Sequence, residues 1–413
     1  MTERRHPPKP NRRALLRTLG AAGLAAASAH PAWAAGLLPS PPNLRAASGT
    51  LLPLSGGRLV GKLRSADANG LRLPKGFSSR IIARSGRRIS GTDYVWHNTP
   101  DGGATIATDD GGWIYVGNSE EDGGRGGASA VVFDADARII DAYRICSGTS
   151  RNCAGGMTPW NTYLSCEEVS RGRIYECDPF GNEDPVARSG MGRFEHEAAA
   201  VDPDTGFVYL TEDKSDGCLY RFVPYDYGDL SDGVLEVGCV DSRNRDRLVW
   251  KAVPYPEPRS TSSSDSTRNQ VAGSRRFNGG EGCWCHEGQV YFTTKGDDCV
   301  WSLDVASNLV RKVYDASEQD APVLDGVDNL VAASNGVLYV AEDGGNMQIC
   351  LLGQDGSTAV LLQVTNQSSS ELTGVAFSPD GSRLYFSSQR GTSGSGSGGI
   401  TYELTGPFLS LEV

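Results

Sequence analysis

Short segments of apolar residues recur along the chain, and each follows a turn rich in Gly, Asp or Asn. Within each segment an apolar residue, a tyrosine, a second apolar residue and a small polar residue follow one another. The tyrosines are Tyr115, Tyr163, Tyr209, Tyr291, Tyr339 and Tyr385, spaced 48, 46, 82, 48 and 46 residues apart. A period of 46–48 residues built from short strands is typical of β-propeller blades with four strands each. We therefore predict an all-β fold, a six-bladed β-propeller.

The long interval of 82 residues predicts an insertion between the third and fourth blades, over about residues 235–275. Its middle, residues 257–270, is a polar run typical of an exposed loop. We place the propeller at residues 86–413 and an N-terminal arm at residues 35–85.

The N-terminus has the order of an export signal. Arg12 and Arg13 precede an apolar run over residues 19–29, and an Ala-Trp-Ala cleavage site ends at Ala34. The 11-residue run is too short to anchor the chain in a membrane, which takes about 20 residues. The alternative is an arginine-rich tail. The signal predicts export by the twin-arginine (Tat) translocase, removal of residues 1–34, and a periplasmic or secreted protein.

The net charge limits the classes of partner, and the cysteine content bears on disulfides. The net charge is −11, and removal of a segment with six basic residues and one acidic residue leaves −16. Such a charge disfavours nucleic acid and anionic membranes as partners. Ten cysteines in an exported chain allow disulfides, whose connectivity the sequence leaves open.

Acidic residues fall at matching places in the repeat. The third and fourth positions after the tyrosine include Cys166, Glu167, Glu212, Asp213 and Glu342. A second register, 10 to 12 residues before the tyrosine, contains Glu197, Glu281 and Asp328. Since neighbouring strands of a blade are antiparallel, both registers should open on one face.

So many carboxylates near one axis would repel one another unless cations bind between them. Oxygen ligands suit calcium, whereas the thiolate of Cys166 favours a transition metal such as iron. A single acidic turn, such as the one with Glu212 and Asp213, is more often a solvated loop, and Cys166 alone is more often structural. Their coincidence in the repeat predicts a mixed site that holds calcium and a transition metal such as iron. His196 should point away from Glu197, so that it packs or supports a ligand and is not a ligand itself.

Several motifs resemble the PhoX-type alkaline phosphatases, in order from about residue 90 to the C-terminus. They are Thr-Pro-Trp-Asn-Thr-Tyr-Leu-Ser-Cys-Glu-Glu (158–168), Gly-Arg-Phe-Glu-His-Glu-Ala (192–198), Asp-Asn-Leu (328–330) and Thr-Gly-Val-Ala-Phe-Ser-Pro-Asp-Gly (373–381). The resemblance implies a Tat-exported six-bladed propeller that hydrolyses phosphomonoesters with ferric (Fe³⁺) and calcium (Ca²⁺) ions. By position, the ligands it implies are Cys166, Glu167, Glu197, Glu212, Asp213, Glu281 and Asp328.

The chain departs from the family pattern before Glu281. Asn-Gly-Gly-Glu (278–281) stands where the family has Asp-Arg-Pro-Glu. Arg275, Arg276 and Arg390 are candidates to hold a substrate phosphate, and the alternative for each is a solvated arginine. No side-chain nucleophile is evident. The alternative functions are a calcium-dependent lactonase-like hydrolase and a non-catalytic metal-binding propeller; a monomer is the default expectation for a complete propeller.

Overall fold

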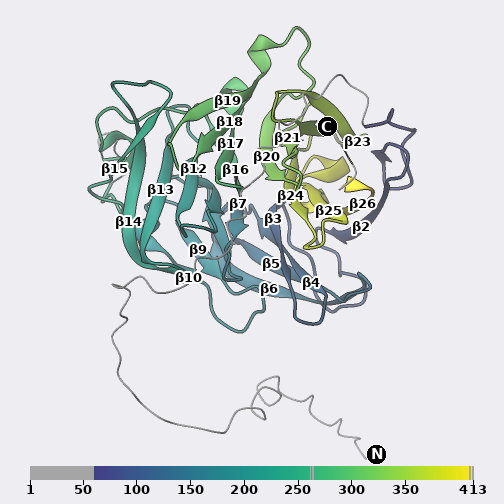
Figure 1. Ribbon diagram of the computed structural model, residues 1–413. Helices are drawn as coiled ribbons and strands as arrows, with labels where there is room; N and C mark the ends of the chain where they lie inside the picture. The colour runs from purple at the N-terminus through teal and green to yellow at the C-terminus, as the bar shows by residue number, and fades with distance from the viewer. Residues whose placement is uncertain (1–59, 261, 263–264, 409–410, 412–413) are drawn as a thin grey trace, which may run out of the picture. The chain divides into compact units, whose positions relative to one another are not determined.

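The computed structural model describes residues 60–260, 262, 265–408 and 411. The predicted signal and residues 35–59 of the predicted N-terminal arm lie outside these residues. The described part of the chain forms six antiparallel sheets of four or five strands. In Figure 1, β3, β7, β16, β20 and β24 lie around the middle of the propeller, and outer strands such as β6 and β15 lie toward its rim. The six-bladed β-propeller predicted from the repeat is confirmed.

The first three blades follow one another along the chain from the innermost strand outward. Blade 1 contains β3 (Pro100–Ala107), β4 (Trp113–Ser119), β5 (Gly126–Phe133) and β6 (Ile139–Thr149). Blade 2 contains β7 (Asn152–Met157), β8 (Tyr163–Glu167), β9 (Ile174–Cys177) and β10 (Val186–Ala187). Blade 3 contains β11 (His196–Val201), β12 (Val208–Glu212), β13 (Leu219–Asp226), β14 (Asp229–Val240) and β15 (Leu248–Ala252).

The last three blades follow the same order, but two of them are completed by strands from near the N-terminus. Blade 4 contains β16 (Gly280–His286), β17 (Gln289–Thr294), β18 (Cys299–Asp304) and β19 (Val310–Asp315). Blade 5 contains β20 (Val327–Ala332), β21 (Leu338–Glu342), β22 (Gln348–Leu352), β23 (Thr358–Val364) and β1 (Leu71–Arg72). Blade 6 contains β24 (Leu372–Phe377), β25 (Arg383–Ser388), β26 (Ile400–Thr405) and β2 (Ser78–Arg84).

Short 3-10 helices lie in the connections between strands. They are η2 (Ser189–Met191), η3 (Thr267–Asn269), η4 (Lys295–Asp297), η5 (Ala316–Glu318), η6 (Gly391–Ser393) and η7 (Gly396–Gly398). The described residues include no helix with the length and apolarity needed to span a membrane.

The six repeat tyrosines lie on the second strand of each blade, and every one is buried. Apolar side chains of neighbouring blades pack between the sheets, as where Trp113 and Phe133 of blade 1 meet Tyr385 of blade 6. The innermost strands contact one another in a closed ring. The repeat was visible in the sequence because each blade needs the same buried aromatic at the same place.

Two features differ from the expected boundaries. Strands β1 and β2 fall within the predicted arm of residues 35–85, yet they pair with β23 and β26 at the outer edges of blades 5 and 6. They carry no tyrosine repeat, because they are fourth or fifth strands and not second strands. The predicted insertion at about 235–275 contains the fifth strand β15 and part of the connection 253–279 that includes η3.

Candidate metal centre

The innermost strand of each blade begins with an interruption of regular pairing. In β11, for example, pairing with β12 passes from His196 directly to Ala199. Such a bulge turns the side chain of an unpaired residue out of the regular alternation. We call the second residues of the six innermost strands the inner ring: Asp101, Cys153, Glu197, Glu281, Asp328 and Thr373.

A second ring is formed by the residues that directly follow the second strands. We call these the outer ring: Glu120, Glu168, Asp213, Lys295, Asp343 and Gln389. The two rings touch in several blades. In one such contact, Gln389 Nε2 donates to Asp101 Oδ2 at 2.5 Å and to Glu120 Oε2 at 2.7 Å.

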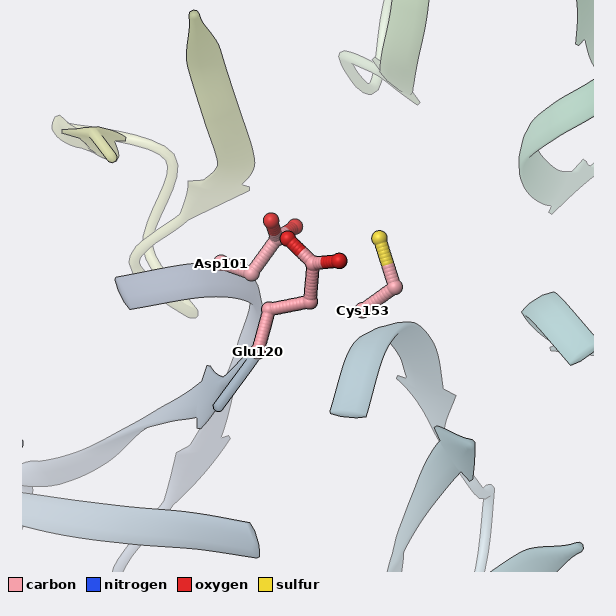
Figure 2. A group of neighbouring side chains, drawn as sticks. All are labelled: Asp101, Glu120 and Cys153. Carbon is pink, nitrogen blue, oxygen red and sulfur yellow. The ribbon is translucent and has the colours of Figure 1, made fainter. Parts of the chain in front are cut away.

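Ligand atoms of the two rings converge in three groups. The groups are Asp101, Glu120 and Cys153; Cys153, Glu168 and Glu197; and Glu197, Glu281 and Asp328. Within each group the ligand atoms lie within 4.8 Å of one another. Figure 2 shows the first group, in which the carboxylates of Asp101 and Glu120 meet beside the Cys153 thiol. Because Cys153 and Glu197 each belong to two groups, the geometry suits neighbouring cations that share ligands.

The Glu197 carboxylate is buried without a hydrogen-bond partner in the described part of the chain. Its side chain is 1% exposed, and neither carboxylate oxygen has a hydrogen-bond partner among the described residues. Burial, followed by the charges of Glu281 and Glu168, raises its pKa well above the ordinary value. Burying an ionised carboxylate without a partner costs on the order of several kcal/mol. A bound cation would satisfy both oxygens, so the donor set fits a metal ion.

The pKa values of the neighbouring groups are raised as well. Burial raises the pKa of Asp328 to about 7 and that of Glu168 to about 8, although Lys295 and Arg151 respectively oppose the shifts. Burial and the nearby carboxylates, Asp101 first, raise the pKa of the Cys153 thiol well above its usual value. Metal binding reverses these shifts, because ligands bind in their deprotonated forms.

Comparison with known proteins gives a family match. The family model described as alkaline phosphatase PhoX matches residues 126–176 and 170–302. The predicted resemblance to the PhoX family is confirmed. A structure of Pseudomonas fluorescens PhoX, in complex with vanadate as a transition state analogue, aligns with a TM-score of 0.65 and 18% sequence identity. The alignment covers 84% of this chain and 98% of that chain, and it shows the PhoX fold.

Two further comparisons gave no similarity from which a function can be inferred. A gluconolactonase from Xanthomonas campestris aligns over 85% of this chain and 99% of that chain, but at a TM-score of 0.47 and 14% identity. This similarity is too weak to support a functional comparison. No curated protein sequence matches the chain.

The structure brings three predicted ligands together, Glu197, Glu281 and Asp328, as the third group. Cys166 belongs to none of the three groups found among the described residues, although the charge of Glu197, after burial, raises the pKa of its thiol. Cys166 is fully buried and packs in an apolar cluster that includes Ile174 and Met191. The thiol that lies among the carboxylates, and therefore the candidate soft ligand, is Cys153.

The difference arises from one residue of strand register. In β12 and β21 the residue that pairs with the first residue of the innermost strand, Glu212 or Glu342, lies three positions after the tyrosine. In β8 the residue with this pairing is Glu167, four positions after the tyrosine. Cys166 precedes it, and because side chains alternate along a strand, its thiol faces the opposite side.

Glu167, Glu212 and Glu342 share a structural role. Each accepts a hydrogen bond from the backbone N–H six residues later, at 3.1, 3.2 and 2.9 Å respectively. Glu167 also accepts from the Ser150 N–H, and Glu212 also pairs with Arg268. These carboxylates therefore close the turns between second and third strands. Asp213 lies in the outer ring, 3.8 Å from Lys295 Nζ.

The predicted phosphate-binding arginines are dispersed. Arg275 lies over the Phe277 and Trp301 rings, and Arg276 donates to the Asp216 carbonyl oxygen. Arg390 approaches the site, where its Nη2 lies 3.0 Å from Glu371 Oε1.

Sequence reasoning missed Asp101, Glu120, Cys153, Glu168, Lys295, Asp343, Arg151 and Glu371. Arg151 Nη2 lies 2.8 Å from Glu120 Oε1 and 2.6 Å from Glu168 Oε2. Two signals were present. The register 10 to 12 residues before the tyrosine, applied to Tyr163, contains Cys153, and the fourth position after Tyr291 and Tyr339 holds Lys295 and Asp343. His196, predicted to pack, stacks on Phe194 with ring centroids 3.7 Å apart.

Proposed function

We propose that this protein is an exported metal-dependent phosphatase that hydrolyses phosphomonoesters at an iron and calcium cluster on the propeller axis. The observation that carries the proposal is the set of three ligand groups linked through Cys153 and Glu197. The match to the PhoX family supports the reaction class. The twin-arginine sequence and the cleavage site after Ala34 support export by the Tat translocase to the periplasm or beyond.

The donor atoms suggest how the cations would be divided. Asp101, Glu120, Cys153, Glu168 and Glu197 supply one thiolate and four carboxylates to the first two groups. The thiolate favours iron there, whereas the third group is made only of carboxylate oxygens and suits calcium. When bound, such cations supply positive charge that stabilises a phosphoryl group as negative charge develops on it.

Arginine side chains at the edge of the site would orient the substrate. Arg151 and Arg390 have side chains that are 39% and 35% exposed, and both pair with acidic residues at the edge of the site. Guanidinium groups bind phosphate oxygens in a bidentate manner. Cations bound to Glu120 and Glu168 would weaken their hold on Arg151, which leaves its donors free for a phosphate.

The proposal is tested with protein exported by the Tat route and supplied with iron and calcium. Hydrolysis of p-nitrophenyl phosphate at alkaline pH and the iron and calcium contents are measured together. We expect Glu197→Gln to lose metal and to lower kcat/KM by about 100-fold or more, since it removes a ligand shared by two groups. Glu183→Gln, at an exposed turn in blade 2, is the matched control and should leave both unchanged.

Two outcomes would overturn the proposal. A colourless protein with calcium alone that hydrolyses lactones would show the lactonase-like alternative. A protein that retains iron and calcium but hydrolyses no phosphomonoester would show a metal-binding propeller without this activity.

A further inference from the structure

Lys295 breaks the pattern of the outer ring. Four of the other positions in this ring carry carboxylates, and the two rings together contain eight carboxylates, yet blade 4 supplies an ammonium. The Lys295 Nζ atom lies 2.7 Å from Glu281 Oε1. It also lies 3.8 Å from Asp213 Oδ2 and 3.7 Å from Asp343 Oδ2. The ammonium is therefore surrounded by carboxylates from blades 3, 4 and 5.

The backbone holds Lys295 in this position. Its N–H donates to the Gly279 carbonyl oxygen at 2.8 Å, and the next N–H, of Gly296, donates to the Asn278 carbonyl oxygen at 2.9 Å. Gly279 has a φ of 70°, and a Cβ atom there would lie 3.3 Å from the Gly296 nitrogen. The absence of a side chain at Gly279 leaves the space beside Lys295 open. Lys295 is thus the first residue of η4, and the two backbone hydrogen bonds fix the position from which its side chain extends into the site.

The position of the ammonium resembles that of a bound cation. Glu281 is 2% exposed, and its carboxylate belongs both to the third ligand group and to the surroundings of Lys295. Three carboxylates around one point would bind a hard divalent cation if no ammonium were present. We propose that Lys295 is a built-in cation that takes the place of a metal ion between Asp213, Glu281 and Asp343, and so limits how many ions the site holds.

This inference rests on the metal cluster of the proposed function and is independent of the phosphatase reaction. Lys295 acts as a positioning residue: it neutralises carboxylates, keeps Glu281 oriented and excludes a further divalent ion. A charge held by the chain is always present, whereas an exchangeable ion would depend on its concentration outside the cell. Loss of the ammonium should therefore create a calcium site that the natural protein lacks.

The test counts calcium ions bound to each purified, iron-loaded protein by equilibrium dialysis with ⁴⁵Ca²⁺. We expect Lys295→Met to bind one calcium ion more per chain than the natural protein, and Lys295→Arg to bind the same number. Lys214→Met is the matched control, because Lys214 has a similar exposure and pairs with Glu195 outside both rings. In the Lys295→Met protein, Asp343→Asn should remove the additional ion again.

Thermal unfolding of each variant identifies any protein that fails to fold, in which case Lys295→Gln replaces Lys295→Met. An unchanged calcium number in a folded Lys295→Met protein would overturn the inference. The same holds if Lys295→Met only weakens the binding of inorganic phosphate, because the lysine would then be a substrate ligand. If the natural protein hydrolyses no phosphomonoester, only the proposed function is contradicted, since the number of bound ions does not depend on turnover.

Discussion

Cys153 and Cys166 lie on adjacent strands of the same blade, yet their thiols have different surroundings. Cys166 packs in an apolar cluster, and its pKa is raised first by burial and then by the charge of Glu197. Cys153 lies among Asp101, Glu120, Glu168 and Glu197. A thiol becomes a metal ligand only as the thiolate, and it does so readily where a cation offsets the charges around it.

At the residue scale, this contrast predicts opposite effects of two substitutions. Cys153→Ser should lower the iron content several-fold and remove visible absorption that arises from iron bound to a thiolate, because oxygen replaces the soft donor. Cys166→Ala should keep the iron and cost about 1 kcal/mol of stability through a small cavity. Elemental analysis and absorption spectra of both proteins test this. Iron lost from Cys166→Ala but kept in Cys153→Ser would contradict the assignment.

The same residues show what the sequence could and could not establish about the site. Glu197, Glu281 and Asp328 were predictable, because each follows the first residue of an innermost strand at a nearly constant distance from the tyrosine. Cys166 does not belong to the three ligand groups found among the described residues, because one additional residue in β8 shifts the side-chain alternation there. Distances along the sequence do not reveal such a shift, whereas backbone pairing does.

At the scale of elements, a carboxylate accepts backbone hydrogen bonds in the turn after the second strand of blades 2, 3 and 5, and in blade 5 this residue is Glu342. It is fully buried, and its two oxygens accept from the N–H groups of Asp325 and Gln348. A carboxylate used in this way stabilises the hairpin and has little capacity left for a metal ion.

We therefore expect Glu342→Ala to lower the free energy of unfolding by about 2 kcal/mol, since two buried N–H groups lose their acceptor. The metal content should not change. Urea unfolding and elemental analysis measure the two quantities, with Glu318→Ala at the exposed η5 turn as the control. A stable protein that has lost calcium would show instead that Glu342 is a ligand.

Strand β2 closes the propeller, because the chain's early residues pair with its late strand β26. Ile82 of this strand is 5% exposed and packs in a cluster with Trp96, Tyr115 and Tyr385. The sequence did not predict this strand as part of a blade, since an outermost strand needs no buried tyrosine. Closure depends on pairing between distant parts of the chain, which a local pattern does not encode.

Ile82→Ala should accordingly lower the free energy of unfolding by about 2–4 kcal/mol, as expected for a large buried side chain replaced by alanine. Arg84→Ala, at an exposed position of the same strand, should change it by less than about 0.5 kcal/mol. Urea unfolding of both variants tests the pair. Equal stabilities would mean that β2 contributes little to closure.

At the scale of the whole molecule, the repeat that builds the propeller also builds the site. Each blade presents the start of its innermost strand and the end of its second strand to the same face, so six blades supply two rings. The fold was predictable from this repetition. The chemistry at each position, such as Lys295 in place of a carboxylate, differs from blade to blade, and only the assembled rings show which charges meet.

The assembled rings also predict how stability depends on pH when no ion is bound. In the unfolded chain Asp and Glu lose their protons near pH 4. In the folded protein, burial holds the pKa of Asp328 at about 7 and that of Glu168 at about 8. Between about pH 4 and 8 the unfolded chain thus binds fewer protons than the folded chain, so the free energy of unfolding falls as the pH rises.

Thermal unfolding in the presence of a chelator, at about 0.15 M salt to screen surface charge, should show a midpoint that falls between about pH 5 and pH 8. Asp328→Asn should flatten this dependence, because the amide does not titrate. Excess calcium and iron should reverse it, since ions displace the bound protons and bind more tightly as the pH rises. A chelated protein whose midpoint rises with pH as steeply as that of the ion-loaded protein would show that burial does not hold the carboxylates of the two rings protonated.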